Sequence, residues 1–190
     1  MAEQKPESSQ KHSLEYWLAK ACDPYEEDAK QRTHFVKGFY EQVNEELEGP
    51  QIACRLLAHK VQSPNEQEAL NGLEALDACV RNCGPRFHNE LAKFRFLNEL
   101  IKLLSPKYLG AETKDRVKQR TIELMYSWKQ TMRHLVKVKQ AYDMLKEQGV
   151  ITADPTYMDN ILSADPIPAP SPRPKAASFE DEEKSEVAKM

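Results

Sequence analysis

The chain has 190 residues, with 27 Lys and Arg against 30 Asp and Glu, so its net charge is only −3 at neutral pH. This length suits one domain with tails, because domains usually run to about 100–150 residues. Its apolar runs are far shorter than the about 18 residues that span a membrane, and the start MAEQKPESSQKHS is too polar for a signal peptide. We therefore expect a soluble, intracellular protein and neither a membrane-spanning nor a secreted one.

Helix signals fill the first third of the chain. Ser13 can cap a short helix that stops before Asp23-Pro24, because proline disfavours helical backbone in the residue before it. A second helix is expected over residues 28–46, where apolar side chains recur at helical spacing. A third has Pro50 in its first turn, directly after the break EGP.

The fourth helix has the clearest start signal, the motif SPNE. Ser63 can cap this helix, Pro64 can take its first position, and Glu66 can complete a capping box. Gly84 precedes Pro85 and is expected to end the helix in a left-handed conformation.

The remaining helices are short and closely linked. They are expected over residues 87–91, 93–104, 114–130 and 135–148, the last one ending at Gly149. No stretch alternates apolar and polar residues as a strand does. We therefore predict an all-α fold, a stack or bundle of eight short helices.

The composition changes after Asp154-Pro155, where IPAPSPRPK is rich in proline and lacks apolar periodicity. The last stretch, FEDEEKSEVAKM, resembles the start of a further region that the chain barely begins. We expect four parts: a disordered tail at 1–12, a helical domain at 13–153, a Pro-rich linker at 154–178 and a truncated region at 179–190.

The stretch KFRFLNELIKLLSPKYLG carries more apolar surface than one core-facing stripe requires. Phe94 and Ile101 widen its apolar arc to roughly half of the helix, against a minimum of about 100°, with polar Asn98 between them. The helix over 135–148 has a similar spare flank, formed by Lys137, Ala141 and Met144. These helices can offer a surface to a partner. Alternatively, the apolar members belong to the core and the charged ones are simply solvated.

Motifs for catalysis or metal binding are sparse. The four cysteines, at positions 22, 54, 79 and 83, include no C-x-x-C pair and are expected to be core thiols without a metal. The histidines are scattered, and no G-x-S-x-G or H-E-x-x-H motif occurs, so we expect neither an enzyme nor a cofactor. A buried catalytic base at His59 is the alternative.

Charge is unevenly distributed along the chain. Residues 1–85 carry 9 Lys and Arg against 15 Asp and Glu, whereas residues 86–149 carry 14 against 7. The positive excess suits an acidic peptide, phosphoinositide headgroups or nucleic acid, or it is only a solvated surface. No nucleic-acid recognition motif accompanies it, so nucleic acid is not an expected partner.

Several long motifs together resemble a known family. EGPQIACRLLAHKVQSP, NCGPRFHNELAKFRFLNELIKLLSPKYLG, AYDMLKEQGVI and PSPRPKAASFEDEEKS follow one another as in the VHS module of GGA adaptors. The resemblance covers about residues 13–185. It implies a right-handed superhelix of eight helices, followed by a linker into a GAT domain.

The resemblance also implies a function. GGA proteins are monomeric clathrin adaptors at the trans-Golgi network and endosomes, and their VHS domain recognises Asp-x-x-Leu-Leu signals in receptor tails. Mannose 6-phosphate receptors and sortilin are the typical cargo. By this resemblance we expect a monomeric cargo-recognition module that is cytoplasmic and peripheral on those membranes. In the family, ARF and clathrin are bound by regions that this chain lacks.

In that family the peptide lies between the sixth and eighth helices. The matching positions are Lys93, Phe94, Arg95, Asn98, Ile101, Leu104 and Tyr108, on or just after the sixth helix, with Lys137 and Met144 on the eighth. Lys137, with Arg95 nearby, would bind the Asp of the signal, and Asn98 would bind the peptide backbone. The apolar members would form pockets for the two Leu side chains.

The chain departs from the family pattern at several positions. Thr33 and Gln67 stand where VHS domains that bind ubiquitin weakly carry tryptophan, so ubiquitin binding is kept only as an alternative. MRHL replaces the family's Pro and acidic pair ahead of the last helix, and Arg133 near Lys137 would favour an acidic signal. A phosphoinositide-binding module is a further alternative, with a basic run of Lys107, Lys114, Arg116, Lys118 and Arg120.

Overall fold

The computed structural model describes residues 12–164, and this part of the chain contains helices and no strand. The eight expected helices are present as α1 (Leu14–Cys22), α2 (Ala29–Glu45), α3 (Gly49–Val61), α4 (Glu66–Asn82), α5 (Pro85–Leu91), α6 (Phe94–Leu104), α7 (Asp115–Thr131) and α8 (Val136–Glu147). A short 3-10 helix, η1 (Thr156–Met158), and α9 (Asp159–Ala164) follow them. Within the described residues, no helix combines the length and the apolar character needed to cross a membrane.

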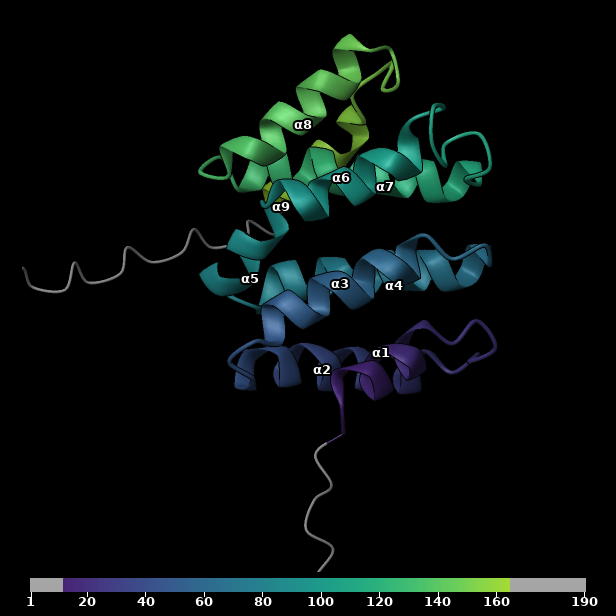
Figure 1. Cartoon of the computed structure of the whole chain (residues 1–190), viewed down its shortest axis with the longest axis vertical. Coiled ribbons are helices and arrows are strands. Elements are labelled where there is room, and N and C mark those ends of the chain that lie inside the picture. Colours follow the sequence, from purple (N-terminus) through teal and green to yellow (C-terminus); the bar gives the residue numbers. More distant parts are fainter. Residues whose placement is uncertain (1–11, 165–190) are drawn as a thin grey trace, which may run out of the picture.

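The helices stack in layers along the long axis of the molecule (Figure 1). α1 and α2 form one end, α3 and α4 form the middle, and α6, α7 and α8 form the other end. The middle helices contact both neighbours, since α1 and α2 pack on them from one side and α6 and α7 from the other. Each layer therefore buries its apolar face against the next. The predicted all-α fold is confirmed.

Side-chain caps fix the ends of several helices where the sequence predicted them. Ser13 accepts the N–H of Tyr16 at 3.1 Å, and Asp28 accepts that of Lys30 at 2.9 Å. Both bonds satisfy a backbone donor that has no partner within its own helix. The chain leaves α8 through Gly149, whose φ of +75° lies in the left-handed region that glycine adopts without strain.

Two predicted helix ends were wrong. α4 begins at Glu66, because Asn65 takes the cap position and accepts the N–H of Glu68 at 3.0 Å, whereas Ser63 accepts only the N–H of Asn65. Gly84 has a φ of −81° and an extended ψ of −154°, so it is not a left-handed cap but the residue before α5. The proline that follows it favours this extended backbone.

The turn between α2 and α3 requires a residue without a side chain at Gly49. A Cβ there would lie 2.2 Å from the carbonyl oxygen of Val43, a backbone atom that cannot rotate away. We expect Gly49→Ala to lower the free energy of unfolding by about 1–3 kcal/mol, the usual cost of overpacking, as measured by urea denaturation. Gly84→Ala is the control, because a Cβ there meets nothing within 4 Å. Equal losses in the two variants would contradict this explanation.

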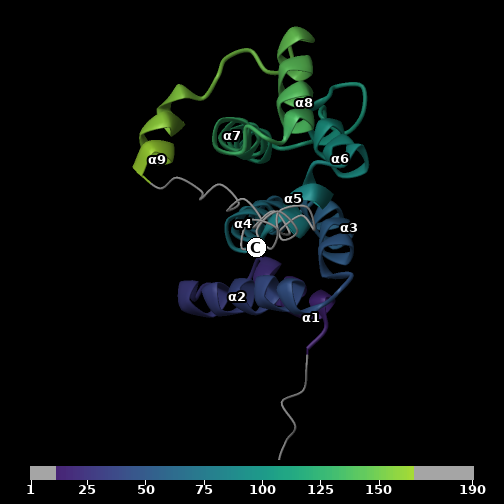
Figure 2. The same ribbon diagram turned by 90° about the vertical axis from the view of Figure 1, so that its left-hand side faces the viewer.

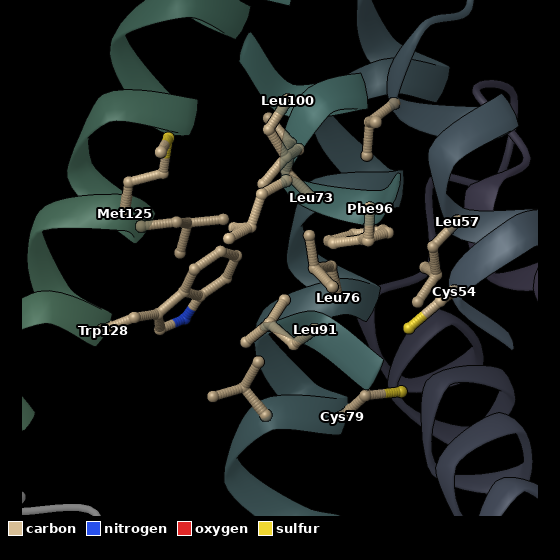
Figure 3. Packing of buried hydrophobic residues seen from close by; sticks show 14 of the residues in the cluster. Cys54, Leu57, Leu73, Leu76, Cys79, Leu91, Phe96, Leu100, Met125 and Trp128 are labelled. Carbon is tan, nitrogen blue, oxygen red and sulfur yellow. The ribbon is translucent and has the colours of Figure 1, made fainter. Parts of the chain in front are cut away.

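One apolar core runs through the layers. Trp128 and Met125 point from α7 toward the leucines of α4, α5 and α6 (Figure 3), and both are completely buried. All four cysteines are free and buried, which confirms their prediction as core thiols. Burial raises the pKa of Cys22 to about 12, and it raises that of Cys54 as well, because the thiolate would lose its hydration.

The chain beyond α8 differs from the predicted linker, which was expected to begin at residue 154. Residues 156–164 are instead helical, as η1 and α9, and Figure 2 shows α9 near α7 on the side away from α8. Met158, Ile161 and Leu162 recur at helical spacing, and Met158 is buried. The proline-rich composition starts only after this stretch. The expected tail, apart from His12, and the expected region at 179–190 lie outside the described residues.

Candidate functional site

One edge of α6 carries the apolar side chains that the sequence singled out. Phe94, Asn98 and Ile101 follow one another at i, i+4 and i+7, so they share this edge. Phe94 is 72% exposed, Asn98 is partly exposed, and Ile101 is only 9% exposed. Leu104 continues toward the core and is 3% exposed. The edge therefore has a closed apolar floor and one large exposed ring.

The flank of α8 that faces α7 and the following segment has its positive charges paired. Lys129 of α7 binds Asp143 at 2.8 Å, and Lys139 lies 3.9 Å from the same carboxylate. Lys146 binds Asp154 at 2.9 Å. These three cations therefore already have acidic partners within the fold, with Lys129 and Lys139 sharing Asp143.

The opposite flank of α8 is different. Lys137, Ala141 and Met144 follow it at i, i+4 and i+7. Ala141 is buried, Met144 is 37% exposed, and Lys137 is exposed without an ion pair among residues 12–164. α8 packs against both α6 and α7 (Figure 2), so this flank is the one beside α6. We call the surface formed by Phe94, Asn98, Ile101, Leu104, Lys137, Ala141 and Met144 the α6–α8 face.

The turn from α7 to α8 is fixed by two buried side chains, Met132 and Leu135. Arg133 and His134 between them are exposed. Arg133 lies four residues before Lys137, at the same end of α8, and forms no ion pair among the described residues. The helix N-terminus adds a partial positive charge there. This end of the α6–α8 face therefore carries positive potential.

Exposed apolar side chains are concentrated in α6, the loop after it and α8. Large apolar side chains are exposed at ten described positions, and five of these belong to α6, to the loop after it or to α8: Phe94, Tyr108, Leu109, Val136 and Met144. Phe94 and Met144 are therefore surface residues, whereas Ile101 and Leu104 are buried, as the alternative of core residues expected.

Two predicted positions of α6 point elsewhere. Lys93 is paired with Glu90 of α5 at 2.6 Å, so its charge is partly neutralised. Glu99 lies on the edge of α6 next to α3, because it accepts a hydrogen bond from Gln62 at 2.6 Å. Arg95 lies between this edge and the edge next to α8. Its side chain starts on the outer surface of α6, one row further from α8 than Asn98. Its proximity to Lys137 stays a prediction.

Sequence reasoning missed two exposed apolar residues, one in α8 and one in the loop after α6. Val136, the first residue of α8, is 57% exposed, and Leu109 in the loop after α6 is 37% exposed. A helical wheel indicates that Val136 is exposed, because this residue lies roughly opposite the buried stripe of Val138 and Tyr142. No periodic signal exists for Leu109, since it lies in a loop.

Two hollows lie away from this face. One of about 450 Å³ lies between α2, α4 and α7, where Arg120 pairs with Glu74 at 2.7 Å and with Glu123 at 3.4 Å. Another of about 250 Å³ lies beside Trp17, between α1 and α2. His59, the alternative catalytic base, is exposed on α3 and lines neither hollow. The alternative of a catalytic base requires a buried His59 in a polar cleft. His59 does not lie in such an environment.

Comparison with known proteins agrees with the earlier resemblance. Human ADP-ribosylation factor-binding protein GGA3 is 54% identical over 176 residues, which cover 92% of this chain and 24% of that protein. Human GGA1 is 48% identical over 92% of this chain and 26% of its own length, and mouse GGA2 is 51% identical over 92% and 28%. The chain thus spans about a quarter of the length of these curated relatives.

A solved structure shares the fold. The tandem VHS and FYVE domains of Hrs align with a TM-score of 0.62 and 21% identity, over 73% of this chain and 62% of that one. The model of the VHS domain family matches residues 8–149, which include α1 to α8 completely. The chain belongs to the VHS domain family, and its VHS domain is of the type found in GGA proteins.

Proposed function

We propose that this chain is the cargo-recognition module of a clathrin adaptor and that its α6–α8 face binds acidic dileucine signals, Asp-x-x-Leu-Leu, in receptor tails. The observation that carries the proposal is the unpaired Lys137 on the flank of α8 beside the apolar edge of α6. A cation next to an apolar strip complements a peptide with one acidic and two apolar side chains. This function is binding, without a chemical reaction.

The acidic residue of the signal is the part that Lys137 would recognise. A carboxylate accepting hydrogen bonds from an ammonium group is held roughly twice as strongly as a neutral partner. Arg133 and the start of α8 add positive potential at the same end, which steers an acidic peptide toward it. Asn98 is partly exposed on the facing edge of α6 and can bond the peptide backbone.

The two leucines would be held by the apolar part of the face. Ile101 and Leu104 are already buried, so they form a floor, while Phe94 and Met144 have surface left to cover. Rotation of these exposed side chains can open the leucine pockets, since methionine is flexible and interface rotamers often change on binding. Each buried leucine contributes about 1.5–3 kcal/mol. After the cost of ordering the peptide, we expect a micromolar Kd, around −8 kcal/mol.

We place this activity in transport from the trans-Golgi network to endosomes, with the domain peripheral on those membranes. Receptors such as the mannose 6-phosphate receptors and sortilin are the proposed cargo. Weak, reversible binding suits cargo that must be released. The relatives are named for binding ADP-ribosylation factor, but the match covers only about a quarter of their length. We assign contacts with that factor and with clathrin to regions outside the match.

The phosphoinositide and ubiquitin alternatives have less support. In the basic run, Arg116 lies 3.6 Å from Glu66, and Arg120 is bound to Glu74, so two of its five cations are paired. Thr33 bonds the carbonyl of its own helix. Gln67 likewise donates to Asn71 on its own helix, at 2.9 Å. The phosphoinositide alternative therefore rests on Lys107, Lys114 and Lys118, which have no ion pair in the described part of the chain.

The proposal is tested by calorimetric titration of the chain with a receptor-tail peptide containing Asp-x-x-Leu-Leu. We expect micromolar binding, weakened by about tenfold or more when the peptide's Asp is changed to Ala, as befits a lost hydrogen bond to a charged group. Asn98→Ala should also weaken binding, whereas Asn89→Ala, an exposed asparagine on α5, should not. Absence of binding by a chain that circular dichroism shows to be folded would overturn the proposal.

A further inference from the structure

The chain continues for a compact stretch beyond the end of the VHS family match at residue 149. We call residues 150–162 the C-terminal strap. It starts at Gly149, after which the N–H groups of Val150 and Ile151 both donate to the carbonyl of Leu145 in α8, at 3.0 and 3.2 Å. Ile151 is buried at 1% exposure. The strap is thus continuous with the end of α8 and packs on the core.

Asp154 ties the strap to α8 through two side chains. The Tyr142 hydroxyl donates to one carboxylate oxygen at 2.7 Å, and the Lys146 ammonium donates to the other at 2.9 Å. These bonds, first that of Lys146 and then that of Tyr142, lower the pKa of Asp154 below its ordinary value. Their contribution is therefore complete at neutral pH and is lost only as the pH falls through that lowered pKa.

The other end of the strap is tied to α7. The Tyr126 hydroxyl donates to Asp159 at 2.7 Å. Tyr157 accepts a hydrogen bond from Gln119 and donates one to Glu123, both at 2.6 Å. The strap therefore crosses from the end of α8 to α7 and is hydrogen-bonded to both helices.

The tyrosines under the strap lie where α7 and α8 meet. Tyr126 and Tyr142 are both buried, and their ring centroids are 6.0 Å apart. The Lys129 ammonium lies 4.8 Å from the centre of the Tyr142 ring, which adds a cation–π contact. Tyr142 projects from the side of α8 away from Lys137 and Met144. A change at Asp154 can thus alter the position of α8 without a direct contact with the α6–α8 face.

We propose that the C-terminal strap sets the position of α8 and thereby the affinity of the α6–α8 face, with Asp154 as a positioning residue. This inference rests on the proposed function of that face. α8 begins without a side-chain cap, and its flank beside α6 consists largely of exposed side chains. The ties at Tyr142 and Lys146 therefore hold α8 on the other side, together with the ion pair between Lys129 of α7 and Asp143.

The test compares Asp154→Ala with Asp159→Ala, which removes one of the strap's bonds to α7 and none of its bonds to α8. For Asp154→Ala we expect Kd for the Asp-x-x-Leu-Leu peptide to rise about three- to tenfold, as for mutations that change coupling between sites. Amide hydrogen exchange should accelerate in α8 and stay unchanged in α1 to α4. For Asp159→Ala we expect less than about a twofold change in Kd. Asp154→Asn keeps an acceptor for Tyr142 and should restore part of the affinity.

The two readouts separate this inference from the proposed function. If the wild-type chain binds no peptide, the proposed function fails, while exchange in α8 still decides whether the strap holds that helix. If Asp154→Ala leaves both exchange in α8 and peptide affinity at wild-type values, the strap does not position α8. Tyr142→Phe removes one of the two bonds to Asp154 from the other side, so it should change exchange in α8 and Kd in the same direction as Asp154→Ala but by less, and wild-type values for both would overturn the inference.

Discussion

Trp128→Ala is expected to lower the free energy of unfolding by about 3–5 kcal/mol, the range for removing a buried aromatic side chain. Trp128 is completely buried and reaches from α7 toward the middle of the stack (Figure 3). Alanine would lose its contacts and leave a cavity that the surrounding helices cannot fill. Domains of this size are stable by only about 5–15 kcal/mol, so the variant should lose a large part of its stability.

The loss is measured by urea denaturation, with two controls. Trp128→Phe keeps a ring, and the indole N–H has no hydrogen-bond partner among residues 12–164, so its cost should be clearly smaller. Tyr25→Ala removes a ring that is 85% exposed and should change stability by no more than about 0.5 kcal/mol. A similar loss for Tyr25→Ala and Trp128→Ala would mean that the core does not extend to α7.

Lys137→Glu is expected to weaken binding of the Asp-x-x-Leu-Leu peptide by at least about tenfold. A hydrogen bond to a charged group contributes about 1.5–3 kcal/mol, and each 1.4 kcal/mol changes Kd by about tenfold. The substitution also places a carboxylate where the peptide's own carboxylate must lie, so repulsion adds to the loss. Because Lys137 is exposed, higher salt should weaken the wild-type complex.

Lys139→Glu is the matched control, because it makes the same charge change on the opposite flank of α8. We expect less than about a twofold change in Kd for it, since distant exposed charges are screened. A peptide with Lys in place of Asp should bind Lys137→Glu better than it binds the wild type. Equal losses for the variants at positions 137 and 139 would indicate a general electrostatic effect and would contradict a specific contact at Lys137.

The helices could be predicted from the sequence where a local signal decides the outcome. Ser13 and Asp28 accept backbone hydrogen bonds from the first turn that follows them, so the chain itself determines where α1 and α2 begin. At α4, two residues could serve as the cap, and Asn65 rather than Ser63 takes it. Local preference cannot separate two good caps that are two residues apart, because the packing of the whole helix chooses between them.

The candidate site could be predicted only in part for a similar reason. Periodicity places Phe94 and Ile101 on one edge of α6, but it does not say that one is exposed and the other buried. Their exposure depends on which other helices cover each turn. The strap was missed because Asp154 reaches Tyr142 through a turn at Gly149, a contact without a sequence period. The composition after Asp154 indicated only a linker.

The burial of the cysteines has a consequence for their reactivity. The thiolate is the nucleophile in thiol chemistry, and burial raises the pKa of Cys22 so far that this thiol is almost entirely un-ionised at pH 7. The other three thiols are also enclosed in the core. A cysteine introduced at an exposed position of α8, such as Gln140, would therefore react with maleimide dyes ahead of the native ones. A fluorophore can thus be attached beside the α6–α8 face without removing any native cysteine.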